Sequence, residues 1–341
     1  MTNSKRSSHE RHKTRTSRLR RPRGGRDARA RSLHLRPASS SGGDGELTTL
    51  KVATIGLVSD GALIRGQEQG FFEEEGLKLE TSVVANPPAG LAAAQGGQVD
   101  IAYAPSIPLL NALSSGVPLK VVAPADGFVA GAADAEDPAT VDDTGLFASA
   151  ASGISSVADL KGATIAIPAR KAQLEVVISD ALDRAGVDPG SVEWVVLDFT
   201  SAVAALQSGT VDAAGLVSPF TAEADAAGAV QLDSPSVGFF EEGAVGLWTA
   251  GKSTIAAKAD AIAAFQRAVA KSNAYANEHP EDAIQAGIDA TGSTLTVDDV
   301  KLPFWPAEVA PVDLERVNDK LVALGFLAAP VDLEGVVLAA G

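Results

Sequence analysis

The sequence predicts an α/β fold made of two similar lobes with a ligand cleft between them. Three observations predict it: short apolar runs alternate with Ala/Leu-rich helical segments, an acidic stretch interrupts this alternation, and one motif occurs on both sides of the interruption. Strands that alternate with helices indicate a mainly parallel sheet with helices on its faces. The 341 residues are enough for two such lobes.

The first alternation begins with LKVATIGL (50–57), a short apolar run suited to a buried parallel strand. A helix that closes at Gly76 is expected to follow it. Further strands are expected at 77–84, 99–105 and 118–124, with short helices between them.

The acidic stretch 131–145 holds few large apolar residues and is expected to be a surface loop. The second alternation follows, with strands expected at 163–168, 192–198, 211–217 and 229–233. KAQLEVVISDALDRAG (171–186) places apolar residues along one face of a helix, at i, i+3, i+4 and i+7. After residue 251 the chain is expected to be helical to its end.

The repeated motif is Gly-x-Val-Asp-x-Ala, in GGQVDIAYAPS (96–106) and SGTVDAAGLVSP (208–219). In each copy the glycine is expected to end a helix, and Val-Asp to open a strand that leads into the next loop.

The predicted organisation is a head and Ser/Gly spacer over 1–47, lobe 1 over 48–145, lobe 2 over 146–235, and a return to lobe 1 with C-terminal helices over 236–341.

The first 36 residues carry a net charge of +11, whereas the remainder carries −26. A like-charge block with few apolar residues is typical of a disordered tail, and a nucleic-acid arm is an alternative. A twin-arginine export signal is disfavoured because no apolar segment follows it.

A further hypothesis is that the head is partly a translation in the wrong reading frame. Shifted by one base, the codons of Arg36-Pro37-Ala38 can encode a small residue, alanine and cysteine before SSSGGDG, as at a bacterial lipoprotein cleavage site.

Composition excludes several classes of chemistry. The chain has no cysteine, which excludes disulfides, thiolate metal sites and cysteine nucleophiles. His279 is the only histidine after the head, so we expect no histidine triad, no zinc site and no cofactor. The acidic body does not offer a basic face to nucleic acid. No acid–base–nucleophile constellation appears, so we do not expect an enzyme.

Several segments together resemble the type II substrate-binding proteins of ABC importers, in their nitrate/sulfonate/taurine and thiamine-precursor branch. They are GQEQGFFEEEGLKLE, LAAAQGGQVDIAYAPSIPLL, GISSVADLKGATIAIP and FQRAVAKSNAYANEHPEDA, and the resemblance runs from about Thr48 to about Val337 in the family's order. It implies a type II periplasmic-binding-protein fold, in which each lobe is a mixed, mainly parallel sheet flanked by helices.

The resemblance also implies partners and a location. The partners are a small-molecule solute, a membrane permease and its ATPase. The location is extracytoplasmic, either periplasmic or lipid-anchored. We expect a monomer that binds no nucleic acid.

Loops that follow strands are expected to line the cleft, because ligands in open sheets sit beyond the carboxyl ends of the strands. In the first lobe these loops supply Ser59, Asp60, Asn86, Pro105 and Ser106. In the second they supply Arg170, Lys171, Asp198, Thr200, Ser218 and Pro219, and Glu241 lies at the return. Helix capping or simple solvation is the alternative for several of them. Tyr103 and Trp248 are expected in the core.

Arg170 and Lys171 oppose the dipole of the helix they precede, which suggests an anionic ligand such as a sulfonate, taurine or nitrate. The alternative is a pyrimidine thiamine precursor or another aromatic nitrogenous solute, bound by Asp60, Asp198 and Glu241. A pyrimidine-forming enzyme of the same fold is a distant alternative, because that branch needs histidine and cysteine. A DNA-linked regulator is disfavoured because residues 1–47 lack the apolar periodicity of a helix-turn-helix.

Overall fold

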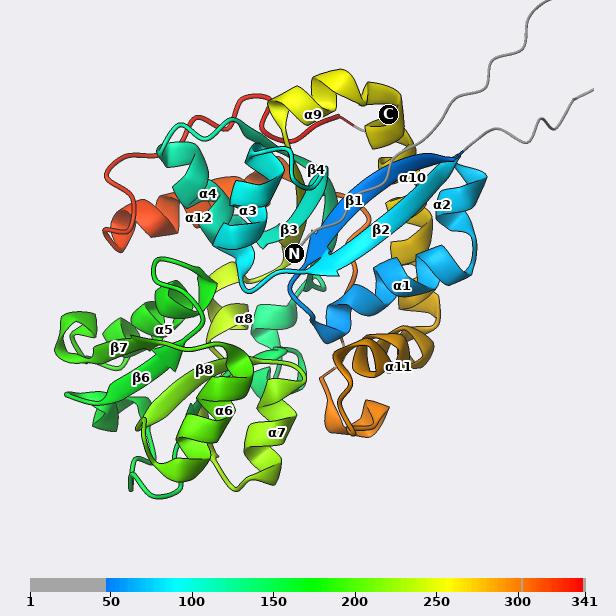
Figure 1. The fold of residues 1–341 in the computed structure, drawn as a ribbon. Helices are drawn as coiled ribbons and strands as arrows, with labels where there is room; N and C mark the ends of the chain where they lie inside the picture. The colour runs from blue at the N-terminus through cyan, green and yellow to red at the C-terminus, as the bar shows by residue number, and fades with distance from the viewer. Residues whose placement is uncertain (1–46, 302, 340–341) are drawn as a thin grey trace, which may run out of the picture. The chain divides into compact units, whose positions relative to one another are not determined.

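The computed structural model describes residues 47–301 and 303–339 (Figure 1). The predicted basic head, and with it the wrong-frame hypothesis, falls on residues 1–46 and lies outside the described residues. Within the described ranges, no helix is both long and apolar enough to cross a membrane.

The first sheet has five strands: β1 (Thr48–Thr54), β2 (Leu77–Val83), β3 (Ile101–Pro105), β4 (Leu119–Phe128) and β10 (Gly243–Gly251). Their order is β2-β1-β3-β10-β4. β1 pairs in parallel with β2 and β3, whereas β10 runs antiparallel between β3 and β4. Every residue of the central strand β3 is buried, which explains its uninterrupted apolar sequence.

The second sheet repeats this arrangement with β5 (Thr144–Ala148), β6 (Thr164–Ile167), β7 (Glu193–Val196), β8 (Ala213–Val217) and β9 (Val230–Asp233). Their order is β7-β6-β8-β5-β9, with β6 parallel to β7 and β8, and β5 antiparallel to β8 and β9. Each sheet with its helices is called a lobe below, lobe 1 for the first sheet and lobe 2 for the second. The predicted α/β fold of two mixed sheets flanked by helices is confirmed.

Helices cover both sheets (Figure 1). In chain order they begin with α1 (Gly61–Glu68), α2 (Phe71–Glu74), α3 (Pro87–Gln95), α4 (Ser106–Ser114), α5 (Gln173–Arg184) and α6 (Phe199–Ser208). The later ones are α7 (Phe220–Ala226), α8 (Pro235–Phe240), α9 (Lys252–Ala257), α10 (Ala259–Glu278), α11 (Pro280–Thr291) and α12 (Pro311–Ala323).

Two sequence predictions about local structure are wrong. The stretch 131–145 is not wholly a surface loop, because Asp142 is buried and Thr144 begins the buried strand β5. The chain is also not helical to its end, since the last helix stops at Ala323. Val337 then forms a parallel bridge with Val121 at the edge of the first sheet, so the tail lies along β4.

The repeated motif has the same structural role in both lobes. The amide of Asp100 donates to the carbonyl of Lys51 at 2.8 Å, and its carboxylate accepts from the Lys51 amide at 2.9 Å. Asp212 does the same with Thr164, at 3.0 and 2.8 Å. Each aspartate therefore fixes the start of one parallel strand against its neighbour, which explains why the motif occurs once in each lobe.

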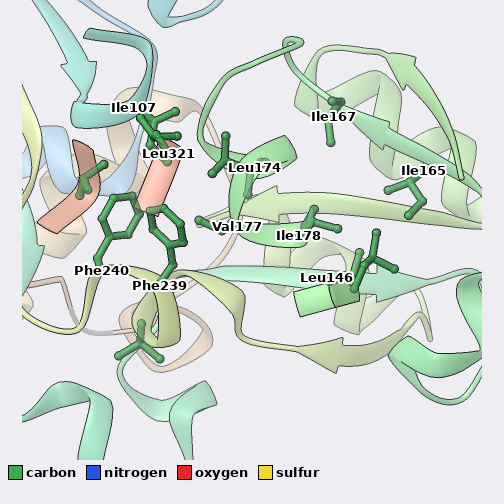
Figure 2. Packing of buried hydrophobic residues seen from close by; sticks show 14 of the residues in the cluster. Ile107, Leu146, Ile165, Ile167, Leu174, Val177, Ile178, Phe239, Phe240 and Leu321 are labelled. Carbon is green, nitrogen blue, oxygen red and sulfur yellow. The ribbon is translucent and has the colours of Figure 1, made fainter. Parts of the chain in front are cut away.

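One apolar cluster extends from lobe 1 into lobe 2. Figure 2 shows Phe239 and Phe240 of α8 beside Ile107 of α4 and Leu321 of α12, with Val177 of α5 next to them. All five side chains are buried. The chain crosses between the lobes twice, over residues 129–143 (the first crossover) and 234–242 (the second crossover). Helix α8 of the second crossover is therefore packed rather than exposed.

Helices α1 and α11 approach each other through glycines. A Cβ on Gly61 would lie 1.9 Å from the Ala283 carbonyl oxygen, and one on Gly287 would lie 2.0 Å from the Val58 carbonyl oxygen. Backbone atoms cannot rotate away from such a contact, so an added methyl group must separate the two segments.

We expect Gly287→Ala to lower the free energy of unfolding by about 1–3 kcal/mol in urea titrations, because overpacking outweighs the higher helix propensity of alanine. The control is Ala290→Gly on the exposed end of the same helix, which should cost at most about 1 kcal/mol. A stabilising Gly287→Ala would contradict the close approach.

Candidate functional site

A cavity lies between the two lobes. Lobe 1 contributes Leu57, Tyr103 and Pro105 to its wall, and lobe 2 contributes Pro168 and Phe199. The space open to the centres of water molecules is about 70 Å³. One water needs about 10–15 Å³ by the same measure, so the cavity accommodates a compact organic group rather than a single water.

The wall of the cavity is mostly apolar and partly aromatic. Its rings come from Tyr103, Phe128, Phe199 and Phe304. No lysine or arginine is among the lining residues that the structure describes. Its charged groups are the carboxylates of Asp126 and Asp143, so the cavity wall is both largely apolar and acidic.

Asp126, on β4, is held by two hydroxyl groups. The Ser59 hydroxyl donates to it at 2.7 Å and the Tyr103 hydroxyl at 3.3 Å. Burial raises the pKa of Asp126, while these two hydrogen bonds act in the opposite direction. A Cβ on Gly246 of β10 would lie 2.2 Å from Oδ1 of Asp126, so glycine at that position makes room for the carboxylate.

Asp143 lies in the first crossover, directly before β5. Its carbonyl oxygen accepts a hydrogen bond from the Ser218 amide at 2.8 Å. Among the described residues, none donates a hydrogen bond from elsewhere in the chain to its carboxylate. Burial raises the pKa of Asp143 well above its usual range, and the negative charges of Asp126 and Asp142 raise it further. This carboxyl group faces the cavity without a protein partner.

The neighbouring Asp142 joins the two crossovers. Its carboxylate accepts from the Thr144 amide at 2.9 Å and from the Val237 amide, in α8, at 2.8 Å. Burial raises its pKa to about 6. The Ser236 hydroxyl oxygen accepts from the Thr144 hydroxyl at 2.6 Å and from the amide of Gln173, which lines the cavity, at 3.4 Å. The cavity wall is thus connected to both crossovers by hydrogen bonds.

Pro105 is the predicted ligand-binding residue that lines the cavity. The other predicted residues of lobe 1 lie behind or beside the wall. Ser59 is buried and supports Asp126, and Asp60 is buried and accepts from the Leu57 amide at 3.1 Å. Asn86 caps α3, accepting from Ala89 at 3.0 Å, and Ser106 is buried with no hydrogen-bond partner for its hydroxyl.

Neither of the two predicted cations of lobe 2 lines the cavity, and the side chain of Arg170 is paired. Arg170 makes two hydrogen bonds to the buried carboxylate of Glu175, at 2.9 and 2.8 Å. The Lys171 amide also donates to Glu175, and Lys171 adopts a left-handed backbone with φ 55°. Its carbonyl accepts from Asn111 of α4, a direct hydrogen bond between the lobes. The guanidinium on which the anion prediction depends is therefore already paired.

The remaining predicted residues of lobe 2 and the return also lie outside the cavity wall. Asp198 caps α6 by accepting from the Ser201 amide at 2.9 Å, and the Ser218 hydroxyl contacts that of Thr221 at 3.3 Å. Glu241 pairs with Lys320 at 2.8 Å. Thr200 is exposed and Pro219 is buried. Ligand contact by these residues stays a prediction.

Sequence reasoning misses Asp126 and Asp143. The strand predicted to end at residue 124 continues to Phe128, and the stretch expected to be a surface loop carries Asp143 into the cavity wall. An acidic residue at the end of an apolar run, as in VVAPAD, is the signal that could identify Asp126.

Two lobes of this topology with a cavity between them define a type II binding-protein architecture. The NMT1-like family model matches residues 43–288, more than half of the chain. The chain belongs to this family. A binding protein of Brucella abortus (strain 2308) is 26% identical over 238 residues, which cover 69% of this chain and 67% of that protein.

Solved structures share the fold. The alkanesulfonate-binding protein of Xanthomonas axonopodis pv. citri, bound to MOPS, superimposes with a TM-score of 0.68 at 17% identity, covering 86% of this chain and 99% of that one. The ligand-binding component of an ABC-type import system from Staphylococcus aureus gives 0.67 at 13% identity, covering 83% and 94%. The predicted resemblance to ABC substrate-binding proteins is confirmed at the level of family and fold.

Proposed function

We propose that this protein is the extracytoplasmic solute receptor of an ABC importer, which binds a small solute between its lobes and delivers it to a permease. The family membership and the fold shared with binding components of import systems support this proposal. In such a receptor the closed state signals occupancy because the ligand contacts both lobes only when they are closed. No reaction is required of the site.

The ligand in this proposal has a positive charge, or several N–H donors, on a flat apolar body. The observation that carries it is the pair of carboxylates, Asp126 and Asp143, in a mostly apolar wall. A carboxylate in a low-dielectric site attracts a cation strongly and repels an anion. The aromatic rings of the wall suit a flat body and a cation alike.

This ligand class corresponds to the nitrogenous alternative drawn from the sequence rather than to the sulfonate-like anion. It relies on different carboxylates from Asp60, Asp198 and Glu241. Among the described residues no lysine or arginine lines the cavity to attract an anion, and Arg170 is paired with Glu175.

The test compares three isosteres of different charge: benzamidinium, benzamide and benzoate, together with taurine, methanesulfonate and nitrate. We expect benzamidinium to raise the unfolding temperature of the full chain, since a ligand at about 100 times its Kd adds roughly 2.7 kcal/mol of stability. Benzoate and the sulfonates should not. A shift with the anions alone would contradict the ligand class, and so would no shift with any compound.

Two variants sharpen the test. Asp143→Asn should weaken benzamidinium binding by roughly 30-fold or more, because it removes one partner of a desolvated charge pair. Arg170→Ala should leave that binding unchanged, whereas it would abolish the binding of an anion held by Arg170. Asp134→Asn, at an exposed position, is the matched control.

A further inference from the structure

We propose that the empty cavity holds one proton shared by Asp126 and Asp143, and that a cationic solute displaces this proton when it binds. The inference rests on the proposed function and concerns how the same cavity selects its ligand. It makes Asp143 the residue that sets the charge of the solute.

The first support is the unequal hydrogen bonding of the two carboxyl groups. Asp126 accepts from Ser59 and Tyr103, and both of these donors favour its ionised form. Asp143 accepts from no other residue in the described part of the chain, yet it lines the same cavity. Without such donors, the Asp143 carboxyl group holds its proton more tightly than a fully solvated aspartate does.

The second support is the sign of the surrounding charges. The titratable groups that act on the pair are Tyr103, Asp60 and Asp142, all of which are acids. No lysine or arginine lines the cavity within the described ranges. Burial raises the pKa of both members of the pair. The negative charge of Asp126 raises the pKa of Asp143 further, so ionisation of Asp126 opposes ionisation of Asp143.

The exchange conserves charge. The empty pair with one proton carries a single negative charge. When a cation binds, the proton leaves to water, two carboxylates remain, and the ligand restores the net charge to minus one. An anion would instead require the pair to take up a second proton, and a neutral isostere would leave the existing proton in place. The cavity therefore discriminates by charge without a fixed cation.

The first experiment measures protons released on binding. The full chain is titrated calorimetrically with benzamidinium at about pH 6 in two buffers of different ionisation enthalpy, with wild type, Asp143→Asn and exposed Asp134→Asn compared. We expect close to one proton released per cation in wild type and Asp134→Asn, and none in Asp143→Asn. As pH increases toward the upper pKa of the pair, the affinity of the wild-type protein for benzamidinium should rise by up to about tenfold per pH unit.

Binding with identical heats in both buffers would overturn proton displacement while leaving the receptor and its ligand class intact. If benzamidinium does not bind, the proposed ligand class is wrong. The shared proton is then tested by an experiment that needs no ligand. The urea midpoints of wild type and Asp143→Asn are then compared across pH. Because folding raises the pKa of Asp143, its stabilising contribution is complete below about pH 4 and is lost as pH rises through the folded value. The variant should gain on wild type as pH rises, and parallel curves would overturn the inference.

Discussion

Replacing Trp305 with alanine is expected to lower the free energy of unfolding by about 3–5 kcal/mol, measured by urea titration. The side chain is fully buried beside Val58, Ile284 and Ile288. Its indole N–H donates to the Ser59 carbonyl at 2.8 Å. The variant loses the buried ring, opens a cavity and leaves that carbonyl without its donor, so the costs of packing and hydrogen bonding add.

Two further variants separate these costs. Trp305→Phe keeps most of the ring but removes the N–H, and it should lie between wild type and Trp305→Ala. Trp194→Ala, on the edge strand β7 where the ring is only partly buried, should cost less than Trp305→Ala. Equal losses for the two alanine variants would contradict the central position of Trp305. Because Ser59 also supports Asp126, Trp305→Ala should weaken benzamidinium binding as well.

The parallel strands could be predicted from the sequence because they are short apolar runs between helices with recognisable ends. The inserted antiparallel strands could not. β10 reads GAVGLWTAG, and glycine is depleted in strands. Its glycines are explained by neighbours distant in sequence. Gly246 leaves room for Asp126, and a Cβ on Gly243 would lie 2.1 Å from Oδ2 of Asp313.

A cavity between two lobes could be predicted from the sequence, but the charge of its wall and most of its lining residues could not. The carboxyl end of β3 supplies Pro105 to the cavity wall, and ligands in open sheets lie beyond such strand ends. The two carboxylates come from the end of β4 and from the crossover before β5. Local composition around Asp143 is acidic and polar, which normally indicates a surface loop. Burial of this segment depends on packing between the lobes, which a local pattern does not encode.

The pH dependence of stability provides the second large effect. Asp60 is 6% exposed, and burial, aided by the charge of Asp126, raises its pKa to about 7, although hydrogen bonds from Leu57, Thr54 and Gly56 oppose the shift. The folded protein therefore binds this proton more tightly than the unfolded chain does. The stability that it contributes is complete below about pH 4 and is lost as pH rises through about 7. This rise in the pKa of Asp60 corresponds to a contribution of at most roughly 4 kcal/mol to the free energy of unfolding.

We expect urea titrations at a series of pH values to show this loss in wild type and a shallower one in Asp60→Asn. The amide retains an acceptor for the Leu57 N–H and can donate to the Thr54 hydroxyl, so the fold should survive the substitution. Asp134→Asn, on the exposed turn η2 (Ala132–Asp134), should follow wild type. Parallel curves for wild type and Asp60→Asn would contradict the raised pKa. Saturating benzamidinium separates the contributions of Asp143 and Asp60 to the pH dependence of the unfolding free energy. A bound cation should remove the contribution of Asp143. It should leave most of the contribution of Asp60, because Asp60 does not line the cavity.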